Sequence, residues 1–126
     1  MTYIESFQLA NKHRKLLKIV NFYERQIDVL DKMLDEFASK YASCASSAEK
    51  REFHKAFEEK QIMVSDLKQH IKNNDYLLSK EVQQKEGRIE TLLLQDEEHI
   101  EKDVMKFERE VNELSREFRE YLITKI

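Results

Sequence analysis

Histidine and carboxylate side chains are the residues of this 126-residue chain that could hold a metal ion. His13, His70 and Glu97 each lie within or beside a row of apolar residues spaced three and four apart, which is the spacing of one helix face. Imidazole nitrogens and carboxylate oxygens are good metal ligands, and helical bundles hold metal ions in their cores. These three residues are therefore the candidate metal ligands of the sequence.

One local pattern resembles a known metal-binding family. The segment from His70 to Asp75 resembles the last ligand motif of hemerythrins, and His54-x-x-x-Glu58 resembles an earlier one. In that family the two motifs lie on different helices that converge on a di-iron centre. Here both fall on one expected helix, about 24 Å apart, and the His-x-x-x-His pair of the family is missing. We interpret the match as accidental.

A buried polar layer explains the same positions without a metal. His13, Asn74 and Glu97 interrupt three apolar rows, each about ten residues, or about 15 Å, from a shared end of the expected bundle. A histidine, an amide and a carboxylate can hydrogen-bond one another, and such layers fix helix register at some cost in stability. We favour the polar core layer because metal sites bound by bundle carboxylates carry Glu-x-x-His on two helices, whereas this chain has only Asp96-x-x-His99.

The composition restricts the fold that can position these residues. One glycine and no proline leave few residues for tight turns, which argues against an all-β fold and against glycine-rich nucleotide-binding loops. The net charge is only −3, no apolar run exceeds three residues, and residues 1–15 lack the apolar stretch of a signal peptide. We therefore expect an all-α cytoplasmic protein that needs no cofactor and binds neither nucleic acid nor membranes.

Three apolar rows predict three long helices, over residues about 2–43, 47–86 and 88–126. In the first helix the row consists of Leu9, His13, Leu16, Val20, Tyr23, Ile27, Leu30, Leu34, Phe37 and Tyr41. Helices of nearly equal length can cover one another's apolar faces from end to end. The sequence thus predicts one domain, residues 1–126, folded as an elongated, antiparallel, coiled-coil-like three-helix bundle with up-down-up topology. This architecture resembles that of a spectrin-type repeat, although no family motif accompanies it.

The position of the second turn has two candidates. Gly87 suits a helix C-terminus, whereas Asp75 could cap a new helix that begins after Asn74. We favour Gly87 because it divides the chain into three nearly equal helices. The first turn is expected around the single cysteine, Cys44, before a capping box of Ser46 and Glu49.

The first helix carries a second apolar stripe beside its main row. The stripe consists of Ile19, Phe22, Gln26, Val29 and Met33. It either lies under both neighbouring helices or remains exposed as a contact surface. We favour the contact surface, with a homodimer through this helix that builds a larger bundle.

No residue constellation predicts catalysis. We therefore expect a non-enzymatic helical bundle that acts as a protein–protein interaction or structural module and associates with itself. The alternative function is a metal-binding bundle with its site in the polar core layer.

Overall fold

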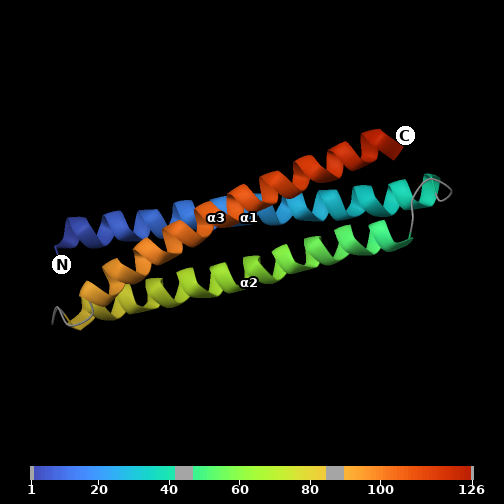
Figure 1. The fold of residues 1–126 in the computed structure, drawn as a ribbon. Helices are drawn as coiled ribbons and strands as arrows, with labels where there is room; N and C mark the ends of the chain where they lie inside the picture. Colours follow the sequence, from blue (N-terminus) through green and yellow to red (C-terminus); the bar gives the residue numbers. More distant parts are fainter. Residues whose placement is uncertain (1, 42–46, 85–89, 126) are drawn as a thin grey trace.

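The computed structural model describes residues 2–41, 47–84 and 90–125. Within these ranges the chain forms three helices and no strand: α1 (Tyr3–Lys40), α2 (Ser47–Gln84) and α3 (Glu90–Lys125). All three helices pack against one another. The predicted elongated three-helix bundle with up-down-up topology is therefore confirmed (Figure 1).

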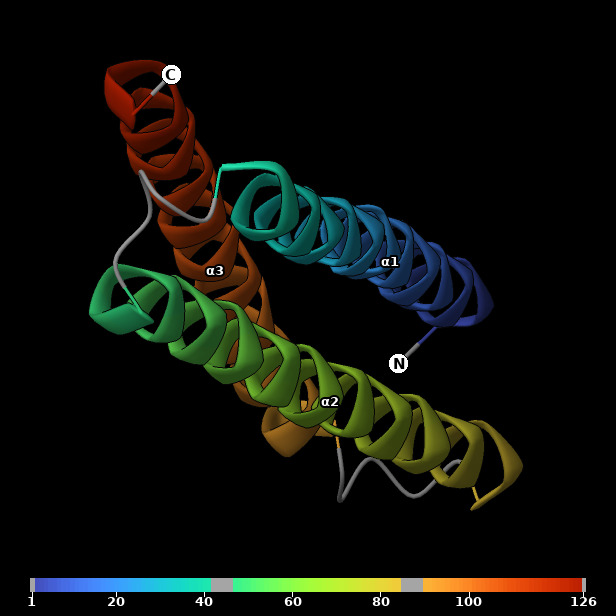
Figure 2. The ribbon, with the colours of Figure 1, turned by 90° about the vertical axis from the view of Figure 1, so that its right-hand side faces the viewer.

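The three helices are not strictly parallel to one common axis. Helices α1 and α2 run antiparallel, and α3 crosses them obliquely, as the side and end views both show (Figures 1 and 2). Helix α3 begins beside the C-terminal end of α2, and its C-terminal half lies beside the second half of α1. Left-handed bundles of long helices show such inclinations because their apolar rows drift around each helix.

The observed helix bounds exclude one of the two candidate positions of the second turn. Helix α2 continues through Asn74 to Gln84, so a break at Asn74 is excluded. Gly87 lies between α2 and α3 in the sequence, but it is outside the described residues, as are Cys44 and Ser46. The described helices also end a few residues inside the predicted bounds, which is the usual error of predicted helix ends.

Helix α1 begins with a capping box that the sequence analysis did not identify. The Thr2 hydroxyl accepts from the Glu5 backbone N–H, at 3.2 Å, and the Glu5 carboxylate accepts from the Thr2 backbone N–H, at 3.1 Å. The two side chains thereby satisfy amides that have no partner within the helix.

The predicted apolar rows form the core. Its buried members in α1 are Leu9, Leu16, Val20, Ile27, Leu30, Leu34 and Phe37, and those of α2 and α3 are Phe57, Val64, Leu67, Ile71, Leu78, Leu93, Ile100, Val104, Phe107, Val111 and Phe118. Aromatic rings gather near the α1–α2 turn, where Phe118 packs edge-on against Phe53 and Phe57, and Tyr121 packs against Phe37. This apolar core supplies the main driving force for folding.

The two faces of α1 provide a matched test of this core. We expect Ile27→Ala to lower the free energy of unfolding by about 2–5 kcal/mol, because Ile27 is fully buried. Val29→Ala, on the exposed face of the same helix, should change it by less than about 0.5 kcal/mol in the isolated chain. Urea unfolding of both variants measures the two effects, and equal losses would contradict this assignment of the core face.

Candidate functional site

The three residues of the predicted polar layer are all buried. His13 is 2% exposed, Asn74 is 0% exposed and Glu97 is 4% exposed, although each carries a polar or charged group. Because a buried polar group is costly unless it is hydrogen-bonded, the partners of each residue decide what the layer does.

Asn74 connects all three helices. Its amide Nδ2 donates to the Leu93 backbone carbonyl, at 3.3 Å, and to Asp96 Oδ2, at 2.9 Å. Its Oδ1 therefore faces α1, where it accepts from His13 Nε2 at 2.6 Å. Every polar atom of this buried amide side chain has a partner, so α2 is tied to both α1 and α3 at one level.

His13 lies between two acceptors. Its Nε2 donates to Asn74 Oδ1, and its Nδ1 lies 2.8 Å from Asp75 Oδ1. The protonated imidazole, which carries an N–H on both ring nitrogens, satisfies both acceptors at once. Asp75 follows Asn74 directly on α2, so two consecutive residues of α2 hold the His13 ring.

Asp96 extends the network across α2 and α3. It accepts from Asn74 and lies 2.7 Å from His70 Nε2. Partial burial alone would raise the pKa of Asp96, but the hydrogen bonds from Asn74 and His70 outweigh it and hold this pKa below its ordinary value. The ionised form of Asp96 is therefore favoured by the fold.

Glu97 lies at the same level but outside this network. Its carboxylate faces Lys12 on α1, with 3.7 Å between Lys12 Nζ and Glu97 Oε1. Within the described residues Oε1 is buried and has no hydrogen-bond partner. Burial raises the pKa of Glu97, and the nearby Glu101 carboxylate adds to this effect, whereas Lys12 opposes it. The ionised Glu97 carboxylate is thus a cost to the fold.

The candidate metal ligands do not form a common site. His13 bonds to Asn74 and Asp75, His70 bonds to Asp96, and Glu97 faces Lys12. Among residues 2–41, 47–84 and 90–125, no group of three or more His, Cys, Asp or Glu side chains could hold a metal ion. The structure therefore does not bring His13, His70 and Glu97 together: His70 contacts Asp96, whereas Glu97, the next residue on α3, faces Lys12.

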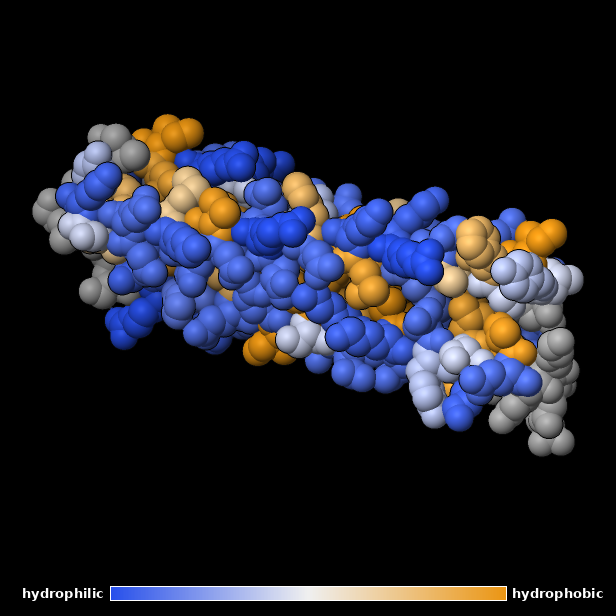
Figure 3. Space-filling model, turned by 180° about the vertical axis from the view of Figure 1, so that it is seen from behind, coloured by the Kyte–Doolittle hydropathy of each residue, from blue (hydrophilic) through white to orange (hydrophobic). Residues whose placement is uncertain are grey.

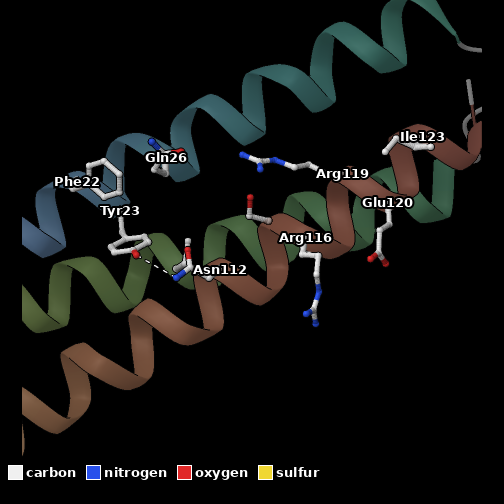
Figure 4. Close-up of a pocket in the computed structure, with 10 residues that line it drawn as sticks. Phe22, Tyr23, Gln26, Asn112, Arg116, Arg119, Glu120 and Ile123 are labelled. Atoms are coloured by element: carbon white, nitrogen blue, oxygen red, sulfur yellow. Dashed lines mark hydrogen bonds between the residues drawn. The ribbon is translucent and has the colours of Figure 1, made fainter.

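A second feature of the molecule is a groove between α1 and α3. Phe22, Tyr23 and Gln26 line it from α1, and Asn112, Ser115, Arg116, Arg119, Glu120 and Ile123 line it from α3, with Val111 at its floor. Its volume is about 340 Å³. Figure 4 shows Arg119 extending from α3 into the space between the helices, and the hydrogen bond from Asn112 Nδ2 to the Tyr23 hydroxyl, at 3.2 Å.

The predicted α1 stripe borders this groove, and α3 covers only part of it. Ile19 packs against the core and Gln26 is half-buried. Phe22 is 48% exposed, Val29 51% and Met33 36%. The stripe is therefore covered in part: Ile19 and Gln26 are half-buried, whereas Phe22, Val29 and Met33 remain exposed.

Ion pairs cross the other two grooves along their length. Between α1 and α2, Glu24 pairs with Lys68, Asp31 with His54 and Asp35 with Lys50. Between α2 and α3, Glu110 pairs with Lys60, Asp96 with His70 and Glu49 with Lys125. Between α1 and α3, the described ion pairs are those of Lys12 with Glu97 and Glu101, near one end of the bundle. Beyond Glu101 the described residues form no ion pair across the α1–α3 groove.

Other apolar side chains are also exposed on the outer surface, among them Tyr3, Ile4 and Phe7 near the start of α1. Seen from behind, hydrophilic residues cover most of the molecule, and hydrophobic ones show as separate patches (Figure 3). In the described ranges, none of the helices has the length and apolar character needed to cross a membrane.

Sequence reasoning found the polar layer but missed part of its network. Asp75 and Asp96 each neighbour a predicted residue, and the contact of His70 with Asp96 was not predicted. An acidic residue beside each of Asn74 and Glu97 was a usable signal, because carboxylates beside a buried amide or imidazole commonly complete its hydrogen bonds.

Comparisons with protein-family models, with curated proteins and with solved structures find no match for this chain.

The hydrogen bond between His13 and Asn74 predicts strong coupling in a double-mutant cycle. We expect Asn74→Leu to lower the free energy of unfolding by about 1–3 kcal/mol, because it leaves His13 and Asp96 short of partners. In the His13→Leu/Asn74→Leu double variant the loss should be smaller than the sum of the two single losses, by about 0.5–3 kcal/mol. Chemical denaturation measures all four proteins, and additive losses would show that the two side chains do not interact.

Glu97 and Asp96 predict opposite pH effects. Since the pKa of Glu97 is raised above 4.5, wild-type protein loses stability as the pH rises through that pKa, and Glu97→Gln does not. Glu97→Gln should therefore match wild type near pH 4 and be the more stable at pH 7.

Since the pKa of Asp96 is lowered below 3.8, wild type should be more stable than Asp96→Asn at pH 7 and lose this advantage in acid. Thermal unfolding across this range checks both signs, and parallel curves for all three proteins would contradict the burial of Glu97.

Proposed function

We propose that this chain is a non-enzymatic, cytoplasmic protein-interaction module that receives a helix on the open face between α1 and α3. The observation that carries the proposal is the exposed apolar row of α1, formed by Phe22, Val29 and Met33. Exposed apolar surface next to a groove is typical of protein contact sites. A docked helix would convert the three-helix bundle into a four-helix bundle.

The spacing of the row fits a helix as the docking element. Phe22, Val29 and Met33 follow one another at intervals of seven and four residues, which keeps them on one face of α1. Anchors at such intervals are typical of helix-in-groove recognition. The neighbouring α1–α3 groove supplies a second wall, with Ile123 as an exposed apolar residue on α3.

The fold itself gives no reason for these residues to be apolar. Replacing an exposed apolar side chain on a helix by a polar one usually costs little stability. The row of α2 that faces away from the core contains Glu52, Glu59, Asp66 and Asn73, which are all exposed and polar. The contrast supports a contact role for the α1 row.

Self-association through α1 is one form of this proposal. The stripe is nearly symmetric about Gln26, with Ile19 and Met33 each seven residues away. Two antiparallel copies of α1 could therefore bury their stripes against each other, as a twofold homodimer requires. The experiment must distinguish a second copy from a different partner.

Site-specific photocrosslinking in cells that express the protein tests the docking face. We expect a photoreactive phenylalanine analogue at position 22 to form a protein adduct. The same analogue at position 62 should form none, since Ile62 is even more exposed than Phe22, at 62% against 48%, but lies on α2, away from the groove. The mass of the adduct identifies a second copy or a different chain. Because the apolar row makes the contact, Val29→Glu should retain the helical circular dichroism of wild type but reduce the adduct at position 22 at least tenfold.

Two outcomes would contradict the proposal. The first is the absence of any adduct at position 22, and the second is equal adduct formation at positions 22 and 62. Loss of helicity in Val29→Glu would instead contradict the exposed position of Val29 in the bundle.

A further inference from the structure

We infer that the occupant of the α1–α3 face is an acidic amphipathic helix of another protein. This inference rests on the proposed function and adds the chemistry of the partner. It follows from the cations that border the apolar row on both sides, none of which forms an ion pair with a described residue.

The cations of α1 follow the apolar row closely. Lys18, Arg25 and Lys32 each lie three or four residues from Phe22 or Val29, on the side away from α3, and all three are exposed. None of them forms an ion pair with a described residue. A helix that docks on the apolar row would therefore have cations along one of its flanks.

The opposite wall of the groove is also cationic. Arg116 and Arg119 line the groove from α3, and neither pairs with a described carboxylate. Arg119 reaches toward α1, whereas the Arg116 side chain points away from it (Figure 4). Among the described residues that line the groove, Glu120 is the acidic one. The chain has a net charge of −3 and described ion pairs across both other grooves, whereas these cations beside the apolar row have no described ion-pair partner. Electrostatic complementarity then favours carboxylates on both flanks of the docked helix.

A second copy of the chain fits this face poorly. Antiparallel pairing about Gln26 would place Lys18 close to Lys32 of the second copy and the two Arg25 side chains close to each other. Like charges in contact oppose association. The cations therefore disfavour the homodimer that the apolar stripe alone would allow.

The shape and polarity of the groove favour a helix over a phosphate-bearing surface. The groove lies between two packed helices, and a third helix fits such a furrow at the usual interaxial distance of about 8–10 Å. Its border is apolar along Phe22, Val29 and Met33, which a nucleic-acid backbone would cover without gaining hydrogen bonds. An acidic amphipathic helix matches both the apolar row and the cations.

Synthetic peptides test the inference on the intact chain. The probe is a helical peptide about three heptads long, with Leu at positions a and d and Glu at the flanking e and g positions. Two matched peptides carry Lys or Gln in place of Glu. We expect the Glu peptide to bind at least tenfold more tightly than either at low salt, and the difference to shrink as the ionic strength rises.

Charge reversal on the protein provides the matched control. Lys18→Glu/Arg25→Glu should lose the preference for the Glu peptide and bind the Lys peptide more tightly. Lys55→Glu/Lys72→Glu, on exposed positions of α2, should bind all three peptides as wild type does. Each substitution changes the net charge by −2, so both double variants change it by −4 and differ only in the face that they alter.

The remaining outcomes separate the inference from the proposed function. Equal binding of the three peptides would overturn the acidic partner and leave the docking face standing. A photocrosslinked adduct of twice the chain mass, or a dimer in sedimentation equilibrium, would identify a second copy and overturn the inference. Tight binding to vesicles containing phosphatidylserine that Lys18→Glu/Arg25→Glu abolishes, without binding of the Glu peptide, would identify a lipid surface instead. Failure of every peptide to bind, with no adduct at position 22, would overturn the docking face as well.

Discussion

The hydrogen bond between His13 and Asn74 is the interaction on which the register of the bundle depends. Apolar rows with a seven-residue repeat can pack again after a shift of one heptad, because Leu, Ile and Val positions then recur. A shift of α1 by one heptad would separate His13 Nε2 from Asn74 Oδ1, which lie 2.6 Å apart. It would leave the buried His13 ring and the Asn74 Oδ1 atom without these hydrogen bonds. The polar layer therefore selects one alignment among several that the apolar core alone would accept.

The surface chemistry follows from this alignment. With His13 beside Asn74, α1 presents Glu24 to Lys68 and Asp31 to His54 on α2. The same register brings Lys60 of α2 within 2.7 Å of Glu110 on α3. Each exposed ion pair contributes little stability on its own. Together these pairs link charged residues across the α1–α2 and α2–α3 grooves. In the α1–α3 groove the described ion pairs lie only near Lys12. The rest of this groove is bordered by the apolar row of α1 and by cations that have no described ion-pair partner.

The sequence predicted how far along the bundle each residue lies better than it predicted which neighbouring helix its side chain faces. Apolar spacing predicted the core from Leu9 to Phe37, because the helix repeat alone decides which residues share a face. Counting along the helices placed His13 and Asn74 at one level. It could not show that Glu97 faces Lys12 whereas its neighbour Asp96 faces Asn74, since that depends on the rotation and oblique crossing of α3. The rotation and oblique crossing of α3 also decide how much of the α1 stripe is covered, so the sequence could not predict this.

The proposed docking of an acidic helix requires a positive local potential along the α1–α3 face of a chain whose net charge is negative. Nuclear magnetic resonance measures such potentials through the relaxation that cationic and anionic paramagnetic cosolutes cause at individual protons. We expect a positive potential at the protons of residues 18, 22, 25, 29 and 32 of α1 and of residues 116 and 119 of α3, although the chain has a net charge of −3. A negative potential along those residues, like that expected for the chain as a whole, would contradict it.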